Sequence, residues 1–244
     1  MTTDALKQLW MLTFGDSAEF VDLFFATAYD PRRCRFLSNG ELPTAALYWL
    51  DTEYRGQKFA YLYGVATHPA HRGKGLCRTL MEDTHAHLKL RGYDGVLLVP
   101  QTEALRQMYR KMGYRDCTAI REFACEAPGD PVALRRIDRD EYAEARRAFL
   151  PADSVVQEDE NIAYLEMMAF FYRGDKFLLA ARREGNHLFC PEILGDISAA
   201  PGILAALNCA SGTFRTPGAG MDFAMFLALE ENARAPGYFG LAFD

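Results

Sequence analysis

Two glycines and three cationic side chains stand together in the segment "AHRGKGLCR", residues 70–78. The segment lies between a strand-like run and a long amphipathic stretch, where a helix is expected to begin. The first turn of a helix exposes unpaired backbone N–H groups at the positive end of the helix dipole. Glycines at that point let a phosphate approach these donors without a side chain in the way. The segment therefore predicts a binding site for an anion.

The elements around this segment alternate between strand and helix. The runs "ELPTAALYWLD" and "KFAYLYGVAT" predict a hairpin across "TEYRGQ". After the glycines, apolar residues recur at helical spacing from Leu76 to Leu88, and Gly92 follows as a C-cap. "GVLLVP" then reads as a buried central strand, and residues 105–112 as a further helix. This order predicts parallel neighbours in a mixed sheet, with the ligand at the carboxyl end of the first strand.

Helical spacing also precedes the hairpin, at residues 6–10 and 20–24, with Asp16 or Ser17 available as an N-cap. The linker-like "EAPGDP" predicts a boundary near residue 127, with one domain at 1–126 and a second at 127–244.

The second domain contains helix-like segments, a hairpin and two further strand-like runs. Their order loosely repeats that of the first half, so we expect the second, smaller α+β domain to be a diverged copy of the first without the glycine loop. For the chain we expect an α/β (α+β) fold, with a mixed central sheet that has helices on both faces. The segments concerned are helices around 140–149 and 161–172, the hairpin "KFLLAA" to "HLFCPEIL", the helix "AAPGILAALNC", and the runs "DFAMFLAL" and "GYFGLAF".

Composition excludes several classes of function. Half of the 244 residues are hydrophobic and the net charge is −6, which argues against a nucleic-acid-binding surface. No apolar run approaches a membrane span, and the start "MTTDALKQLW" lacks the basic region and apolar core of a secretory signal, so we expect a cytoplasmic protein. Six scattered cysteines without C-x-x-C pairs, and His85 and His87 on different helix faces, predict no metal site.

Two motifs together resemble the GNAT family of acyl-CoA-dependent N-acyltransferases. The first is "GVATHPAHRGKGLCRTLM" and the second is "LRQMYRKMGY", in the family's order and spacing over residues 5–125. The resemblance implies a strand that ends in a bulge, a loop that binds the CoA diphosphate at a helix start, and a later helix that completes the site. Two residues depart from the family's pattern: Cys77 replaces a small Gly or Ala, and Thr102 stands where many members have Asn.

The same resemblance implies acetyl-CoA as the acyl donor, bound by strand-end and loop residues. Main-chain groups at Val65 and Thr67 would contact the acyl carbonyl and the pantetheine arm, and the loop amides and cations would hold the diphosphate. The full set of expected cofactor-binding residues is Val65, Ala66, Thr67, Arg72, Gly73, Lys74, Gly75, Leu76, Cys77, Arg78 and Thr102.

Tyr109 occupies the family's general-acid position, where it would protonate the departing thiolate. Its helical spacing also fits a core aromatic. The sequence does not identify the general base, because the strand "KFAYLYGVAT" holds no carboxylate. The candidates are Glu53, His68, His71, Asp244 and a chain of solvent.

The sequence thus predicts an N-acetyltransferase that acts on a primary amine by direct attack in a ternary complex. The acceptor is a small molecule or a protein, and a homodimer is compatible with the second domain's expected role as a cleft cover or subunit interface. The alternative is a non-catalytic acyl-CoA-binding or regulatory module.

Overall fold

The computed structural model describes residues 2–40 and 42–243, which form two compact units. Unit 1 comprises residues 1–115 and 226–235, and unit 2 comprises residues 116–225 and 236–244. The chain therefore passes from one unit to the other three times. This division differs from the expected boundary between 126 and 127, because each unit takes a segment from the other half of the sequence.

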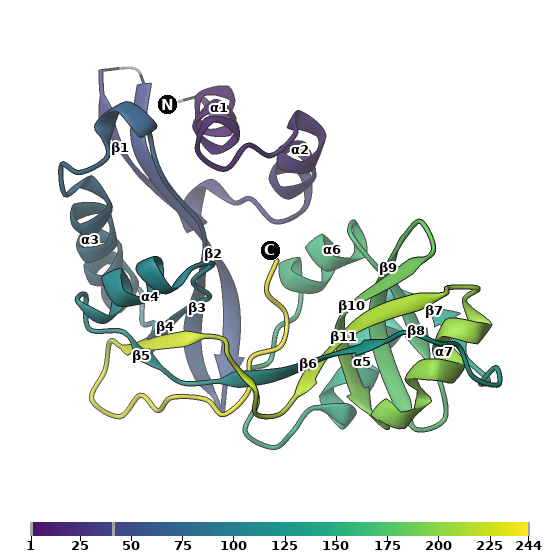
Figure 1. Cartoon of the computed structure of the whole chain (residues 1–244). Helices are drawn as coiled ribbons and strands as arrows, with labels where there is room; N and C mark the ends of the chain where they lie inside the picture. Colours follow the sequence, from purple (N-terminus) through teal and green to yellow (C-terminus); the bar gives the residue numbers. More distant parts are fainter. Residues whose placement is uncertain (1, 41, 244) are drawn as a thin grey trace. The chain divides into compact units, whose positions relative to one another are not determined.

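Unit 1 is a mixed sheet with helices on both of its faces (Figure 1). Helices α1 and α2 lie on one face, and α3 and α4 on the other. The sheet order is β1-β2-β3-β4-β13-β5, in which β1, β2 and β3 are antiparallel and β3 and β4 are parallel. The elements are α1 (Thr3–Phe14), α2 (Ala18–Thr27), η1 (Pro31–Arg33), β1 (Cys34–Asn39), β2 (Leu42–Tyr54), β3 (Gln57–Thr67), η2 (Pro69–His71), α3 (Leu76–Leu90), β4 (Gly95–Leu98), α4 (Glu103–Arg110), β5 (Arg115–Asp116) and β13 (Met225–Ala228).

The elements expected in the first half form where the sequence places them. The hairpin is β2 and β3, Ser17 caps α2 through a bond from the amide of Phe20, and the helix after the glycines is α3. Buried apolar residues at helical spacing on α1 and α3 fix those two helices against the sheet: Leu6, Leu9 and Trp10 on α1, and Leu80, Met81 and Leu88 on α3.

The strand expected from "DFAMFLAL" lies in a different sheet from the one that the sequence suggests. It is β13, and it inserts between β4 and β5 in the sheet of unit 1. The ring of Phe226 stacks near that of Phe59, with centroids 5.2 Å apart, and it fills the space beside Gly95, where a Cβ would lie 2.4 Å from it. In the same way β6, expected in the first domain, joins the sheet of unit 2.

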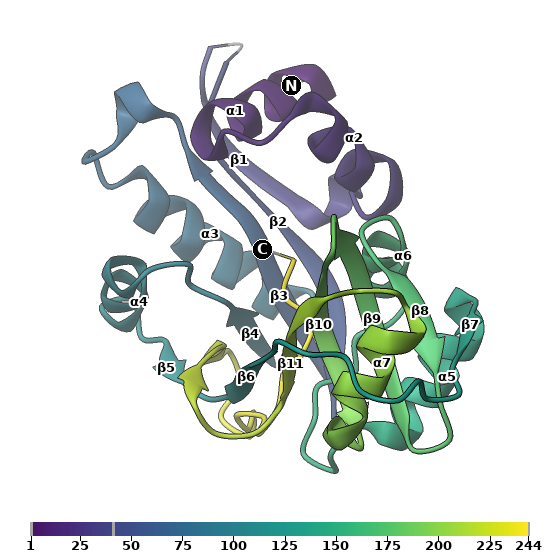
Figure 2. The same ribbon diagram turned by 45° about the vertical axis from the view of Figure 1, so that its right-hand side comes forward.

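Unit 2 is a second mixed sheet in the order β12-β6-β11-β10-β9-β8-β7 (Figure 2). The β9–β10 hairpin is followed by η3, α7 and then β11, which runs parallel to β10. This order repeats the hairpin, helix and parallel strand of unit 1. The elements are β6 (Ala119–Cys125), β7 (Arg135–Ile137), α5 (Arg139–Phe149), α6 (Glu160–Glu166), β8 (Phe170–Arg173), β9 (Phe177–Glu184), β10 (His187–Gly195), η3 (Ile197–Ala199), α7 (Ala200–Ala206), β11 (Ser211–Pro217) and β12 (Met221–Asp222).

Two expectations for this half are wrong. The helix expected over 161–172 ends at Glu166, and residues 170–173 form β8 instead. The run "GYFGLAF" forms no strand; main-chain hydrogen bonds join Tyr238 to Asp153 and Val155, with one isolated bridge between Ser154 and Tyr238.

A buried ion pair holds this C-terminal segment in unit 2. Glu192 is fully buried and accepts from Arg146 Nε at 2.6 Å and Nη2 at 2.9 Å. It also accepts from the hydroxyls of Tyr142 at 3.2 Å and Tyr238 at 2.9 Å. All of these donors point at one carboxylate, so the free energy of burying its charge is offset by four hydrogen bonds.

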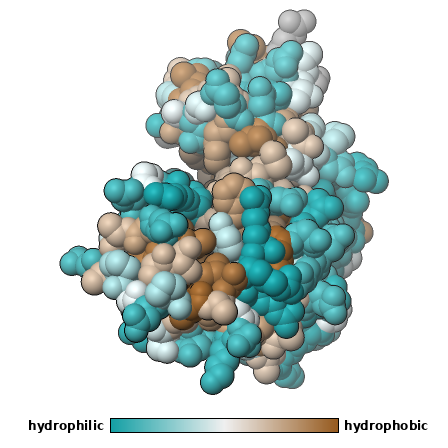
Figure 3. Space-filling model, turned by 90° about the vertical axis from the view of Figure 1, so that its right-hand side faces the viewer, coloured by the Kyte–Doolittle hydropathy of each residue, from teal (hydrophilic) through white to brown (hydrophobic). Residues whose placement is uncertain are grey.

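No helix among the described residues is long and apolar enough to cross a membrane. On the face shown in Figure 3, hydrophilic side chains are spread throughout, with smaller apolar areas between them.

Removing one partner of the buried pair tests its role. Arg146→Met should lower the free energy of unfolding by about 3–5 kcal/mol, because it leaves the Glu192 carboxylate buried without its counter-charge. The neighbouring Arg147→Met removes a largely exposed side chain that pairs with Glu158 and should cost about 1 kcal/mol or less. Urea unfolding followed by circular dichroism measures both; equal losses for the two variants would contradict this role for the pair.

Candidate active site

The glycine loop between η2 and α3 leaves the start of α3 open. Gly73 and Gly75 both have left-handed backbones, with φ of 74° and 78°. A Cβ built at either position would meet no atom of the described residues within 4 Å, apart from the neighbours in the chain. Gly75 is the N-cap of α3, and no side chain of the described residues caps it. The first amides of α3 therefore lack the partner that an N-cap side chain supplies.

Arg72 fastens this loop to two other elements of unit 1. Its Nε donates to the carbonyl of Thr67 at the end of β3, at 3.3 Å, and its Nη2 lies 3.5 Å from the carbonyl of Thr13 near the end of α1. Lys74 Nζ donates to the carbonyl of Ala70 at 3.3 Å. Within 2–40 and 42–243 these two cations bond to main-chain oxygens and to no carboxylate, so no described acid neutralises their charge beside the loop. Arg78, in contrast, lies 3.9 Å from Glu82.

Strand β3 leaves its parallel neighbour before it reaches the loop. It pairs with β4 only from Phe59 to Tyr61, yet it continues to Thr67. On its other edge, β3 carries a bulge at which Gly64 and Val65 oppose the single residue Leu47 of β2. The edge of β3 that faces away from β2 is thus without a strand partner beside the bulge and at the end of the strand.

Gly64 is required at this bulge. Its φ is 59°, and a Cβ would lie 2.8 Å from the ring of Trp10 on α1. Trp10 in turn donates from Nε1 to the carboxylate of Asp16 at 2.8 Å. Neither Gly64 nor Asp16 is among the expected site residues, although an isolated glycine inside a strand pattern is a signal of a bulge.

Tyr109 lies on α4 with its ring buried and its hydroxyl unpaired. The residue is 6% exposed, and its hydroxyl has no hydrogen-bond partner among the described residues. Burial raises the pKa of this phenol well above its usual value, and the nearby Cys77 thiol adds to the rise. Tyr109 therefore keeps its proton at neutral pH, as a general acid must. Helix α4 is fixed locally by the Thr102 hydroxyl, which caps it through the amide of Leu105 at 3.2 Å.

The structure places the remaining candidates as follows. Val65 and Thr67 are partly buried and Ala66 buried on β3; Leu76 and Cys77 are partly buried in the first turn of α3, and Arg78 is exposed. Burial raises the pKa of the Cys77 thiol. Thr102 is occupied as a helix cap.

The candidate bases have other partners. Glu53 accepts from the amide of Gly56 in the hairpin turn. His68 accepts from the amide of Ala70, and its ring lies 5.3 Å from that of His71. Asp244 lies outside the described residues. Within 2–40 and 42–243 no group of three or more His, Cys, Asp and Glu could hold a metal ion.

Comparison with known proteins assigns this unit to a family. The model of the acetyltransferase (GNAT) domain matches residues 2–117. Residues 2–117 are a GNAT acetyltransferase domain. Its family makes it an acyltransferase domain. It contains both sequence motifs, the uncapped start of α3, and the point at which β3 separates from β4. No curated protein matches the sequence.

Solved structures resemble the chain well beyond the GNAT domain. A GCN5-related N-acetyltransferase from Kribbella flavida superposes with a TM-score of 0.67 at 19% identity, over 91% of this chain and 67% of that one. A GCN5-related N-acetyltransferase from Anabaena variabilis superposes with a TM-score of 0.68 at 14% identity, over 94% of this chain and 71% of that one. A tandem GNAT protein from the clavulanic acid biosynthesis pathway superposes with a TM-score of 0.55 at 11% identity, over 94% of this chain and 96% of that one. At these identities the likeness concerns the fold, and it agrees with a GNAT domain followed by a second unit of related layout.

The loop of the GNAT domain gives a controlled test. Gly75→Val should abolish CoA binding, because a branched side chain would crowd a phosphate at the amides. Gly56→Val is the matched control: Gly56 has φ of 77° and equally open surroundings, but it lies in the β2–β3 turn. Both variants carry the same backbone strain, so calorimetric titration with CoA should separate them. Similar affinity in the two variants would contradict a phosphate site at Gly75.

Proposed function

We propose that this protein transfers an acetyl group from acetyl-CoA to a primary amine by direct attack in a ternary complex. The observation that carries the proposal is the pairing, within one GNAT domain, of an uncapped glycine-bearing helix start with a strand that diverges from its parallel neighbour. The uncapped helix start suits a diphosphate, and the separation of β3 from β4 leaves main-chain donors for the rest of the coenzyme.

The diphosphate is proposed to bind the amides from Gly73 to Cys77. Each charge-assisted hydrogen bond contributes about 1.5–3 kcal/mol, and the helix dipole adds to this. Arg72 and Lys74 support the proposal, since both are cations beside the loop that pair with no carboxylate in the described part of the chain. Arg78 adds less, because Glu82 lies nearby.

The acyl group is proposed to lie along the free edge of β3. The amide of His68 donates to the carbonyl of Thr44 on β2 at 2.9 Å. Amides of an extended strand point alternately to its two edges, so those of Thr67 and Val65 are expected to face away from β2. A main-chain donor aimed at the thioester oxygen would stabilise the oxyanion that forms during attack, by about 3–4 kcal/mol.

Tyr109 is the proposed general acid. The neutral amine attacks the thioester carbon, the new C–N bond forms, and the C–S bond breaks. The thiolate takes the phenolic proton of Tyr109, solvent returns a proton to the tyrosinate, and the nitrogen gives up one proton to solvent. We propose solvent rather than Glu53 as the acceptor of that proton, because the Glu53 carboxylate is engaged by the hairpin turn.

The experiment is acyl-CoA-dependent release of free thiol in the presence of a panel of amines, with small polyamines, aminoglycosides and a lysine peptide in separate reactions. Release that requires an amine supports the proposal. Tight CoA binding without release on any amine would contradict it and favour the non-catalytic module. A cytoplasmic location and a homodimer stay predictions.

Tyr109→Phe tests the acid. It should lower kcat by about 10²–10⁴-fold while leaving CoA affinity within about twofold, because only proton donation is lost. Tyr114→Phe is the control on the adjacent ring, whose centroid lies 5.7 Å away; its hydroxyl is already bound to His85 at 2.7 Å, so kcat should be retained. Steady-state kinetics on both variants measure kcat and KM. An unchanged kcat in Tyr109→Phe would show that Tyr109 is not the general acid.

The pH profile gives a further check on Tyr109. Burial raises its pKa above the ordinary value of 10.0, so the folded protein keeps the acid protonated up to and beyond that pH. We expect kcat to rise with pH as the amine loses its proton, and to show no descending alkaline limb below about pH 10. An alkaline limb with an apparent pKa of about 8, absent in Tyr109→Phe, would contradict the assignment.

A further inference from the structure

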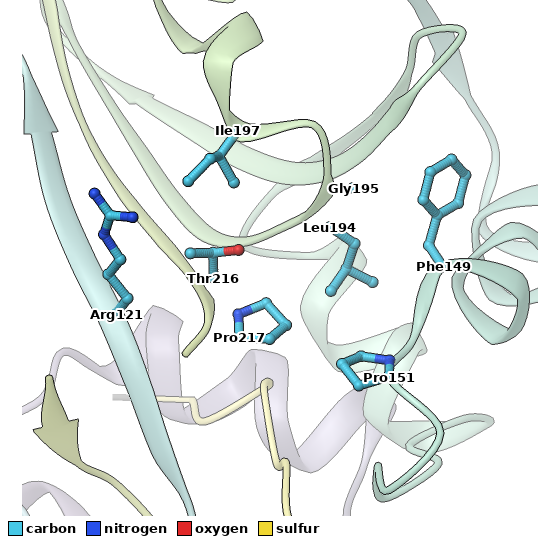
Figure 4. A pocket seen from close by; sticks show the side chains of 8 residues that line it. All are labelled: Arg121, Phe149, Pro151, Leu194, Gly195, Ile197, Thr216 and Pro217. Carbon is cyan, nitrogen blue, oxygen red and sulfur yellow. The ribbon is translucent and has the colours of Figure 1, made fainter. Parts of the chain in front are cut away.

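Unit 2 contains a cavity of about 290 Å³ that no motif in the sequence announces (Figure 4). Most of the residues that line it have no polar side chain, and they come mainly from the end of α5, the end of β10 and the start of η3, but polar and apolar atoms contribute about equally to its surface. The lining residues are Arg121, Phe149, Pro151, Leu194, Gly195, Ile197, Thr216 and Pro217. Its volume lies near the lower end of the range for small-molecule sites, which are typically apolar with a few polar groups.

The two polar side chains of the lining are neighbours on adjacent strands. Arg121 on β6 and Thr216 on β11 are direct antiparallel partners, so their side chains point to the same face of the sheet. Figure 4 shows the guanidinium running beside Thr216, whose hydroxyl oxygen points toward the middle of the lining residues. The cavity therefore presents a cation and a hydroxyl side by side.

Neither polar group has a polar partner among the described residues. Thr216 is only 5% exposed, yet no hydrogen bond from the protein reaches its hydroxyl. The guanidinium of Arg121 contacts the ring of Phe123, 5.5 Å from its centroid, and forms no ion pair in the described part of the chain. The Thr216 hydroxyl and the Arg121 guanidinium are therefore both available to donate to a ligand oxygen in the cavity.

The cavity lies where two parallel strands separate. β10 and β11 pair only as far as Cys190 and Phe214, and then β10 continues to Gly195. A bulge in β10 lies at the point of separation, with Cys190 and Pro191 opposite Ala181. In unit 1, β3 likewise leaves its parallel neighbour, after Tyr61, and carries a bulge shortly beyond that point, at Gly64 and Val65. Ligands of α/β folds bind at the carboxyl ends of such strands.

The counterpart of the phosphate loop is closed to a coenzyme. Asp196 occupies the position before η3, where its carboxylate accepts from the amide and the hydroxyl of Ser198. The Asp196 side chain thus supplies an internal cap for η3, unlike the uncapped start of α3, and η3 and α7 follow without a Gly-x-Gly turn. This segment offers no open helix start for a coenzyme diphosphate, so a ligand that fits within the cavity of about 290 Å³ is favoured.

We propose that unit 2 binds a small monocarboxylate with a short apolar tail. The carboxylate would take a charge-assisted bond from Arg121 and a bond from the Thr216 hydroxyl, and the tail would pack against Phe149, Leu194 and Ile197. This site is independent of acetyl transfer in unit 1.

Titration of the whole protein with hexanoate, followed by ¹⁵N amide shifts, tests the proposal. Saturable shifts in residues 119–123, 194–197 and 214–217 are expected. Hexanol and hexylamine, which share the tail but lack the anion, should bind at least about tenfold more weakly. Saturating CoA should leave the hexanoate shifts in unit 2 unchanged, which separates this site from the acyl site of unit 1.

Variants supply the control. Arg121→Gln should weaken hexanoate binding by about tenfold or more, and Thr216→Val by a few-fold. Arg136→Gln removes another exposed arginine that stacks on an aromatic ring, that of Phe170 on β8, and should leave affinity unchanged. The absence of saturable shifts in unit 2, equal binding of hexanol, or equal affinity in Arg121→Gln and Arg136→Gln would each overturn the proposal.

Discussion

The main-chain amides at the start of α3 are the constraint on which the proposed site depends. A helix that begins with a side-chain cap satisfies its first donors internally, but α3 begins at a left-handed glycine that no side chain of the described residues caps. Such a start presents both unpaired N–H groups and the positive end of the dipole, so an anion is the natural partner. Arg72 bonds to main-chain carbonyls at the end of β3 and near the end of α1, and these bonds hold the glycine loop in a defined position for an anion.

The second element of the site follows from how β3 ends. A strand that stayed paired with β4 along its full length would have no spare donors, whereas β3 is released after Tyr61 and is then bent by the bulge at Gly64. Trp10 packs against that glycine from α1, so the bulge is held by a large ring rather than by hydrogen bonds alone. Unit 2 repeats the release and the bulge but replaces the open loop with Asp196. The same strand geometry thus occurs in one unit with an open glycine loop and in another without one.

Local signals in the sequence predict most of unit 1. Glycine turns, caps and apolar periodicity act within a few residues, so the β2–β3 hairpin, α3 and the loop form where they are expected. The placement of β13 could not be predicted, because an apolar run does not specify its partner; Phe226 fits beside Gly95 and Phe59, more than a hundred residues away in the sequence. The last apolar run forms no strand, since Gln157 binds both main-chain groups of Leu241 and Tyr238 binds the buried Glu192. The cavity at Arg121 and Thr216 also depends on pairing between distant strands, which leaves no motif.

The most direct test is a crystal structure of the protein with acetyl-CoA. The account predicts diphosphate oxygens within hydrogen-bond distance of the amides between Gly73 and Cys77, and the thioester beside β3 beyond Tyr61, with its sulfur near the hydroxyl of Tyr109. A coenzyme bound elsewhere, with the loop amides still facing solvent, would contradict it.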